Sequence, residues 1–153
     1  MFISEVSISN LRATQQNKIK LFPGINILFG SNGVGKTTIL EAISLLSFGK
    51  SFKTNKIETI IKEKEKLAGA YLKTNNKTCI KIKIEHNKKT IKVDDIKIQK
   101  ISDHIDFLPC VVFSPDESTL EGKQNSQKQK NINKILCTID KEYLKTLKKY
   151  NTT

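Results

Sequence analysis

Apolar and polar positions alternate along the first twenty residues in the manner of short β-strands. Val6 and Ile8 lie on one face of the first such segment, and a second segment follows a polar turn and includes Ile19. Residues 25–29 are then almost continuously apolar. A run of this length and kind predicts a strand that is covered on both faces of a sheet.

The period of the apolar positions changes after residue 35. Ile39, Ile43 and Leu46 recur at helical spacing, which predicts a helix over residues 36–46. Gly49 stands just beyond the last of them, where a glycine commonly ends a helix. The sequence therefore predicts a strand, a loop and an amphipathic helix in succession.

Residues 67–93 return to a strand pattern. Three apolar and three charged residues alternate there, at Ile80, Lys81, Ile82, Lys83, Ile84 and Glu85. A polar turn over residues 86–89 can reverse the chain into a second strand over residues 90–93. We expect a hairpin with one buried face and one solvated, basic face.

The last third of the chain is more polar. Residues 111–113 predict a short buried strand, and residues 124–134 carry almost no apolar side chains. A final helix is predicted by apolar residues at helical spacing, namely Tyr143, Leu144, Leu147 and Tyr150. Because little remains to cover its apolar face, we interpret the chain as the truncated beginning of a larger protein.

The loop between the predicted strand and helix fits the pattern GxxxxGK[ST] over Gly30 to Thr37. Glycines allow backbone N–H groups to approach phosphate oxygens, and the positive end of the following helix favours an anion. Lys36 can reach the β- and γ-phosphates, and the Thr37 hydroxyl can ligate Mg²⁺. The sequence thus predicts a site for ATP and Mg²⁺, formed by Gly30, Ser31, Asn32, Gly33, Val34, Gly35, Lys36, Thr37 and Thr38.

A second pair of acids follows the predicted strand at residues 111–113. Asp116 and Glu117 resemble the acidic strand end that holds Mg²⁺ in P-loop ATPases. Pro115 leaves the strand direction, however, which places the two acids beyond the strand end and favours the first turn of a helix. Both interpretations stay open, and no catalytic residue is assigned.

The 153-residue chain has a net charge of +12, carried almost entirely by lysine. Such a charge fits a nucleic-acid partner or merely biased composition. For the lysines of the hairpin, contact with DNA phosphates competes with a simply solvated sheet face; they are Lys81, Lys83, Lys88, Lys89 and Lys92. The sequence shows no signal peptide and no run near the ~18 apolar residues of a membrane span, so we expect a cytoplasmic protein without a membrane partner.

Several segments beyond the P-loop resemble the RecF family of recombination-repair ATPases. They are residues 26–30, 36–43 with its Leu-Glu-Ala-Ile run, 49–54, 111–116 and 143–151. The P-loop is generic, whereas the Gly-Lys-Ser-Phe-Lys-Thr segment at 49–54 is fairly specific. The resemblance covers nearly the whole chain.

This resemblance implies an α/β fold of the P-loop NTPase class, similar to ABC-type and SMC-type ATPase heads. It implies a mixed sheet around the P-loop helix together with an antiparallel strand region, truncated before the catalytic half. Residues 1–113 would form the ATP-binding lobe, and residues 114–153 would begin a helical arm. Arg12 matches a basic residue that approaches nucleotide in such heads, although a solvated surface arginine is an equally open interpretation.

The resemblance also implies a bacterial factor that binds ATP and DNA and forms an ATP-dependent homodimer. It would act with RecO and RecR at single-strand gaps and double-strand junctions, in DNA replication, DNA repair and the SOS response. The basic segment that the family carries is only weakly matched within residues 124–134, where Lys128, Lys130 and Ile132 stand.

The resemblance implies that the intact proteins of the family are weak ATPases. Their hydrolysis of ATP needs a Ser-Gly-Gly motif and a later strand that ends in acidic residues. The last glycine is Gly122, so the motif is absent, and we expect this chain to bind ATP without hydrolysing it. Two alternatives are a small P-loop kinase and a degenerate DNA-binding module. The kinase is disfavoured because Arg12 is the single arginine, and kinases use arginine to clamp phosphoryl groups.

Overall fold

The computed structural model describes most of the amino-terminal two thirds of the chain and parts of the remainder. The described residues are 1–86, 88–99, 108–113, 129, 132–133, 135–137 and 140–150. The chain divides into two compact units, Met1–His104 and Ile105–Thr153, and each is considered by itself. Asp116, Glu117, Lys128 and Lys130 lie outside the described residues, so their predicted roles stay predictions.

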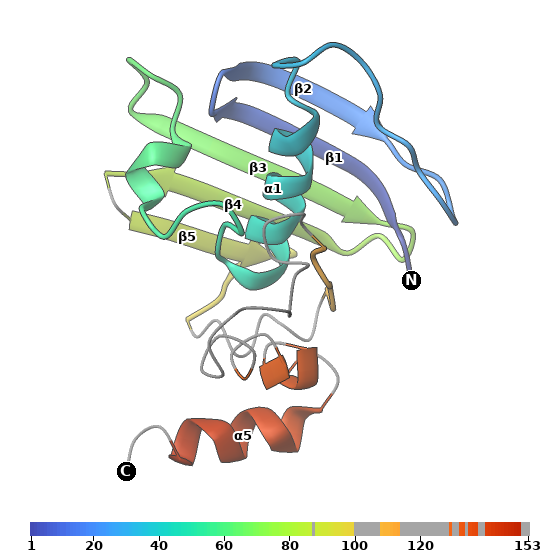
Figure 1. Cartoon of the computed structure of the whole chain (residues 1–153), viewed down its shortest axis with the longest axis vertical. Helices are drawn as coiled ribbons and strands as arrows, with labels where there is room; N and C mark the ends of the chain where they lie inside the picture. Colours follow the sequence, from blue (N-terminus) through green and yellow to red (C-terminus); the bar gives the residue numbers. More distant parts are fainter. Residues whose placement is uncertain are drawn as a thin grey trace. The chain divides into compact units, whose positions relative to one another are not determined.

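A six-stranded sheet in the order β2-β1-β3-β4-β5-β6 forms the first unit (Figure 1). All neighbouring strands in it pair antiparallel. The strands are β1 (Ile3–Leu11), β2 (Thr14–Lys20), β3 (Leu67–Thr74), β4 (Cys79–Glu85), β5 (Lys88–Val93) and β6 (Ile96–Lys97). The antiparallel strand region expected from the sequence is therefore present.

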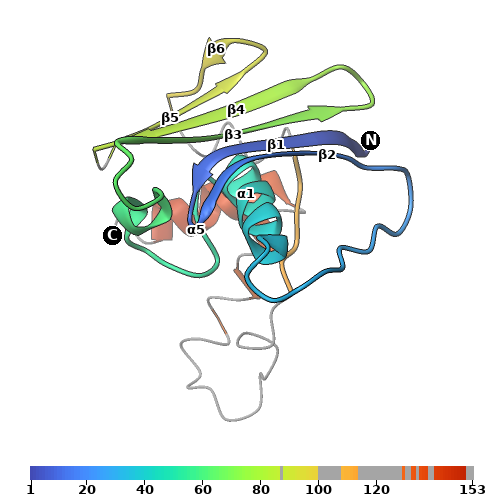
Figure 2. The same ribbon diagram turned by 90° about the horizontal axis from the view of Figure 1, so that it is seen from above.

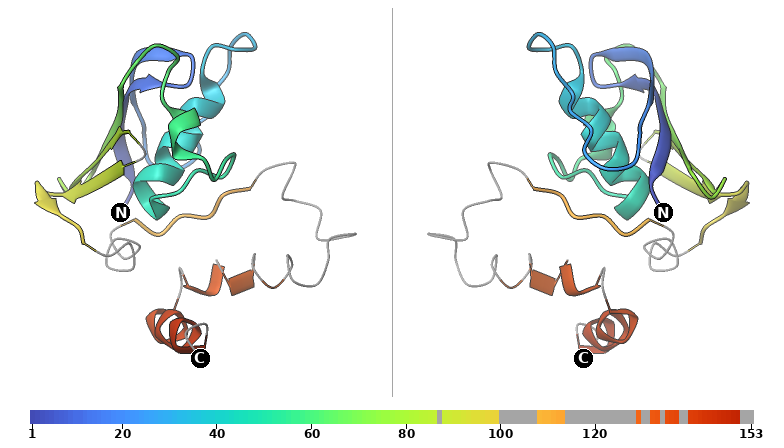
Figure 3. Two further views of the ribbon diagram at one scale, coloured as in Figure 1. Left: turned by 90° about the vertical axis from the view of Figure 1, so that its left-hand side faces the viewer. Right: turned by 90° about the vertical axis from the view of Figure 1, so that its right-hand side faces the viewer.

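One face of this sheet is covered by helix α1, Lys36–Phe48. The short 3₁₀ helix η1, Ile57–Ile60, lies on the same side of the sheet as α1 (Figures 2 and 3). The side chains that meet between these layers are almost completely inaccessible to solvent, and they include Ile8, Leu45, Leu46, Leu72, Ile80 and Ile84. Burial stabilises each by roughly 1.5–3 kcal/mol, which holds α1 in place against the sheet.

The predicted hairpin is confirmed. Strands β4 and β5 pair with Glu85 opposite Lys88, and the isoleucines of β4 are buried while Lys81 and Lys83 are exposed. The predicted end of the first helix is also confirmed, although α1 continues two residues further than its last apolar repeat. Gly49 adopts a left-handed conformation with φ of 64° and donates its N–H to the Leu45 carbonyl.

Lys89 departs from the prediction that all five hairpin lysines share one basic face. Its ammonium instead donates to the carbonyl oxygen of Gly49, at the carboxyl end of α1. A cation there complements the helix dipole. Partial burial lowers the pKa of Lys89 below its ordinary value, and the nearby positive charge of Lys50 lowers it further. Lys89 is thus part of the packing between hairpin and helix.

The prediction of buried strands at residues 25–29 and 111–113 is wrong for this chain. Residues 25–29 are not in a strand, and Ile25 and Phe29 are about nine-tenths exposed. The segment runs as an open trace beyond the edge of the sheet (Figure 2). Residues 111–113 also lack strand structure, and Phe113 is exposed. A continuous apolar run forms a buried strand only when neighbouring strands pair with it, and no described strand does so.

In the second unit the predicted final helix is confirmed as α5, Lys141–Tyr150. Asp140 begins it, because its carboxylate accepts hydrogen bonds from the backbone N–H groups of Glu142 and Tyr143 at 2.8 and 3.2 Å. Tyr150 is exposed. Across the described residues, no helix combines the length and apolar character that crossing a bilayer requires.

An ion pair between a half-buried arginine and a buried carboxylate links the turn between β1 and β2 to α1. Glu41 is only 1% exposed, and its carboxylate is held by two parallel hydrogen bonds from the Arg12 guanidinium, at 2.7 and 3.0 Å. The third donor of Arg12 reaches the Thr59 carbonyl at 2.9 Å. Ser51 donates its hydroxyl to the same carboxylate. These contacts join the strand turn, the helix and the segment that follows the helix.

We expect Arg12→Ala to lower the free energy of unfolding by about 3 kcal/mol, because it leaves the Glu41 carboxylate buried without its cation. The double variant Arg12→Ala/Glu41→Leu should be closer to the parent chain than Arg12→Ala is, since it removes both charges. Urea unfolding followed by circular dichroism measures both. Equal losses in the single and double variants would contradict this account of the ion pair.

Candidate nucleotide-binding site

The loop of residues 30–35 enters α1 through a backbone that favours glycine. Gly33 and Gly35 have φ angles of 85° and 99°, in the left-handed region that side chains with a Cβ rarely adopt. Gly35 is the residue that caps the start of α1. The glycine spacing read from the sequence therefore corresponds to a real requirement of the backbone.

A side chain at position 35 is also excluded by the neighbouring start of β2. A Cβ added at Gly35 would lie 2.7 Å from the hydroxyl oxygen of Thr14, the first residue of β2. A Cβ atom does not approach another heavy atom so closely, because it forms no hydrogen bond, so an alanine would force the turn or the loop to move. Thr14 was not predicted as a site residue, because a contact across 21 residues leaves no pattern in the sequence.

The start of α1 presents backbone N–H groups without acceptors of its own. The first backbone hydrogen bond of the helix runs from Ile39 N–H to the Gly35 carbonyl at 3.1 Å. The amides of Lys36, Thr37 and Thr38 precede it, where a helix offers no partner. No side chain caps this end, and the first turn contains no acidic residue. The positive end of the helix dipole is thus left uncompensated and favours an anion.

The Lys36 ammonium lies over the loop. It donates hydrogen bonds to the carbonyl oxygens of Gly30 and Ser31, at 2.7 and 2.8 Å. The lysine side chain therefore bridges the first residues of the loop and the first residue of the helix. A positive charge is held beside the helix amides, which is the arrangement that a polyphosphate requires.

The other predicted site residues differ in their exposure to solvent. Ser31, Asn32, Gly33 and Val34 are exposed along the loop, so their backbone is accessible. The side chain of Thr37 is also exposed, and its hydroxyl oxygen is a ligand type that suits Mg²⁺. Thr38, by contrast, is buried. We therefore expect Thr38 to serve the site through its backbone N–H alone, and Thr37 to be the residue that fits a metal.

Arg12 is turned toward the helix rather than toward the loop. Its three donor contacts within the described residues go to Glu41 and Thr59, as given above. The solvated interpretation of Arg12 is therefore wrong, because the side chain is tied to a buried carboxylate. Its expected approach to a nucleotide stays a prediction.

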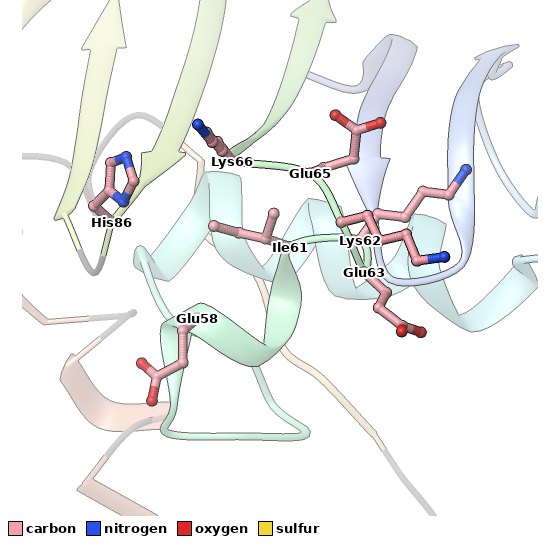
Figure 4. Close-up of a pocket in the computed structure, with 8 residues that line it drawn as sticks. Glu58, Ile61, Lys62, Glu63, Glu65, Lys66 and His86 are labelled. Carbon is pink, nitrogen blue, oxygen red and sulfur yellow. The ribbon is translucent and has the colours of Figure 1, made fainter.

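A separate hollow of about 530 Å³ opens beside η1 and the start of β3 (Figure 4). It is lined by Glu58, Ile61, Lys62, Glu63, Lys64, Glu65, Lys66 and His86. Its three carboxylates point away from one another, so they do not converge on a metal ion (Figure 4). None of the lining residues belongs to the P-loop. Across the described residues, no cluster of three potential metal-ligating side chains occurs.

Comparison with known proteins agrees with this geometry. A family model described as an AAA domain matches residues 5–152. The DNA replication and repair protein RecF of Clostridioides difficile (strain 630) is 33% identical over 156 residues, an alignment covering all of this chain and 42% of that protein. The chain thus spans about two fifths of the length of the curated relatives it matches.

Solved structures give the same result. A structure of the recombination mediator protein RecF with ATP is similar with a TM-score of 0.87 and 28% identity, over 99% of this chain and 43% of that one. An SMC ATPase structure is similar with a TM-score of 0.71 and 17% identity, over 88% of this chain and 99% of the other. The P-loop NTPase fold of the ABC and SMC head type is therefore confirmed. The chain belongs to the AAA-domain family, and its resemblance to the RecF family is confirmed along its entire length.

Proposed function

We propose that this chain is the ATP-binding portion of a RecF-type protein of DNA replication and repair. The observation that carries the proposal is the start of α1, where unpaired amides, an uncompensated helix dipole and the Lys36 ammonium lie together. The relatives are named for DNA replication and repair, and one similar structure is of RecF with ATP. ATP is accordingly the ligand that we assign to this site.

Different groups of the loop would bind different parts of Mg-ATP. Backbone N–H groups from Gly33 to Thr38 would donate hydrogen bonds to the phosphate oxygens, and the Lys36 ammonium would leave its loop carbonyls and bind the terminal phosphates. The Thr37 hydroxyl would hold Mg²⁺, which when bound supplies positive charge to the phosphate oxygens. The ion pair between Arg12 and the buried Glu41 carboxylate would keep the helix that carries these groups fixed to the sheet.

The remaining assignments concern the whole protein, of which this chain spans about two fifths of a relative's length. We propose that DNA is its macromolecular partner, that it forms an ATP-dependent homodimer, and that it acts with RecO and RecR at gaps and junctions in the cytoplasm. A part in the SOS response belongs to the same proposal. Ile25, Ile27 and Phe29 support the idea that further strands cover this lobe, because each would gain roughly 1.5–3 kcal/mol on burial.

The functional division of the chain follows from the same proposal. Residues 1–113 would be the ATP-binding lobe, and residues 114–153 would begin the helical arm. The contacts within the molecule divide the chain at residues 104 and 105, nine residues earlier. A role for residues 111–113 in the first lobe would require them to pair with strands other than those of the described residues.

Removing the lysine ammonium should weaken ATP binding. Lys36→Ala deletes a charge-assisted contact to phosphate, each worth about 1.5–3 kcal/mol, so we expect affinity to fall roughly ten- to hundredfold. Titration calorimetry with Mg-ATP measures this. Lys50→Ala is the matched control, because Lys50 lies beyond the opposite end of α1 and should leave affinity unchanged. Equal affinity in Lys36→Ala and the parent chain would contradict the site.

The two loop glycines should respond differently to alanine. Gly33→Ala faces strain from its positive φ alone, since nothing lies near its added Cβ, whereas Gly35→Ala also meets Thr14 at 2.7 Å. We therefore expect Gly35→Ala to lose more ATP affinity than Gly33→Ala. Adding Thr14→Gly to the Gly35→Ala variant should recover part of that loss. An identical loss in Gly33→Ala and Gly35→Ala would exclude the Thr14 contact as its cause.

This chain should bind ATP without turning it over, because it lacks the Ser-Gly-Gly motif expected of the family. Release of inorganic phosphate from ATP by the purified chain is the measurement, with the Lys36→Ala variant as the background control. We expect the two rates to be equal. Phosphate release by the parent chain that disappears in Lys36→Ala would overturn this expectation.

A further inference from the structure

The side chain of Thr14 lies beside the start of α1, on the helix-covered face of the sheet. Thr14 is the first residue of β2, and the strand register places it opposite Leu11, which is almost completely buried. Directly opposed residues of neighbouring strands project from the same face of a sheet, so Thr14 also faces α1. Its hydroxyl oxygen would lie 2.7 Å from a Cβ added at Gly35, the residue that caps the helix. Thr14 therefore brings a hydroxyl group to the amino-terminal end of the helix.

This hydroxyl forms no hydrogen bond with any of the described residues. A threonine hydroxyl offers one donor and two acceptor sites, and a polar group withdrawn from bulk water usually has a partner. The hydroxyls of Ser44 and Thr74, which are buried, donate to backbone carbonyl oxygens at 2.9 and 3.4 Å. Thr14 is half-buried. Its hydroxyl therefore lies beside the proposed ATP site with a hydrogen-bonding capacity that the described chain does not use.

The direction of a bound triphosphate follows from the position of Lys36. Its ammonium donates to the carbonyl oxygen of Gly30 at 2.7 Å, at the beginning of the loop, and a P-loop lysine binds the β- and γ-phosphates. Gly35 stands at the other end of the loop, beside the first amides of α1. Among the described residues, a Cβ added at Gly30 would have Val34 alone within 4 Å, so Thr14 adjoins the helix end of the loop. The sugar of ATP, which is attached to the α-phosphate, would therefore lie on the side of Thr14.

The hydrogen-bonding character of Thr14 favours a sugar hydroxyl over another phosphate oxygen. Phosphate oxygens only accept hydrogen bonds, and the helix amides and the Lys36 ammonium already supply donors for them. A sugar hydroxyl both donates and accepts, as the hydroxyl of threonine does. Asn17, opposite the buried Ile8, is half-buried on the same face of β2, and its amide has no hydrogen bond within the described chain. A strand face that only packed on α1 would be apolar there, so these side chains indicate a polar occupant.

We propose that Thr14 determines specificity at the ATP site, because its hydroxyl hydrogen-bonds a ribose hydroxyl of the bound nucleotide. The inference rests on the proposed function, since it needs ATP at the start of α1. The loop and Lys36 would bind the triphosphate, and Thr14 would recognise the nucleoside that distinguishes ATP from inorganic polyphosphate. A site with a partner for a ligand hydroxyl disfavours ligands that lack it, because the protein's polar group is then left unpaired. The same contact explains why Thr14→Gly should restore only part of the affinity that Gly35→Ala loses.

The test uses the whole 153-residue chain and compares two ligands by titration calorimetry, Mg-ATP and magnesium tripolyphosphate. Thr14→Val keeps the shape of the side chain without its hydroxyl, so it should bind ATP about three- to tenfold more weakly, as expected for one lost hydrogen bond. Its affinity for tripolyphosphate, which has no sugar, should stay equal to that of the parent chain. Thr14→Ser keeps the hydroxyl and should bind ATP within about twofold of the parent chain.

Two controls make the test specific for a sugar contact. Gln16 is exposed on the same strand and lies opposite the exposed Ser9, on the face away from α1, so Gln16→Ala should leave ATP affinity unchanged. In the parent chain, 2′-deoxy-ATP or 3′-deoxy-ATP should bind about three- to tenfold more weakly than ATP. In Thr14→Val the same analogue should bind as ATP does, because the contact is already absent. An analogue that loses the same factor in both chains would overturn the proposal. Thermal melting establishes that every variant is folded.

The outcomes separate this inference from the function on which it rests. Lys36→Ala should weaken the binding of both ATP and tripolyphosphate, because it acts on the phosphates. If Thr14→Val weakens both ligands equally, or neither, the role of Thr14 in recognising the sugar is wrong but the ATP site stands. If the parent chain binds neither ligand, the proposed function fails, and the inference about Thr14 fails with it.

Discussion

The structure depends on one constraint, that the first turn of α1 has backbone amides with no partner inside the helix. Most helices satisfy such amides with a capping side chain, which contributes about 1 kcal/mol. Here Gly35 occupies the cap position and supplies no side chain, and no acid follows in the first turn. The chain therefore leaves an unfavourable helix end exposed, and a bound anion is what would compensate it.

The contacts around α1 fix the position of its amino-terminal end. Leu45 and Leu46 bury α1 against the sheet, and Lys89 holds its carboxyl end. Glu41 is five residues beyond Lys36, so its ion pair with Arg12 fixes the helix little more than one turn from the proposed phosphate site. The β1–β2 turn is thereby joined to α1 through Arg12 and meets the loop again at Thr14.

The features that could be predicted from the sequence are those that residues close together in the chain determine. The P-loop, the helix ended by Gly49 and the β4–β5 hairpin are each specified by neighbouring residues. The exposure of Ile25 and Phe29 could not be predicted, because burial of that segment depends on strands that do not pair with it here. The Arg12–Glu41 pair likewise leaves no pattern at a separation of 29 residues.

For Lys89, by contrast, the face of the sheet on which it lies could have been predicted from the sequence. Adjacent residues of a strand point to opposite faces, so Lys88 and Lys89 cannot both share the face of Lys81. Counting by twos from the buried isoleucines would have placed Lys89 on the α1 side. Its carbonyl partner at Gly49 would still have required the three-dimensional structure.

The position of Lys36 has a consequence for selectivity among anions. Its ammonium already holds two carbonyl oxygens of its own loop, so an incoming ligand must displace an internal competitor. A small monovalent anion offers too few acceptors to replace both bonds and also engage the helix amides. A chain of linked phosphates can do both at once. We therefore expect the proposed site to favour ligands that bring several acceptors together over small monovalent anions.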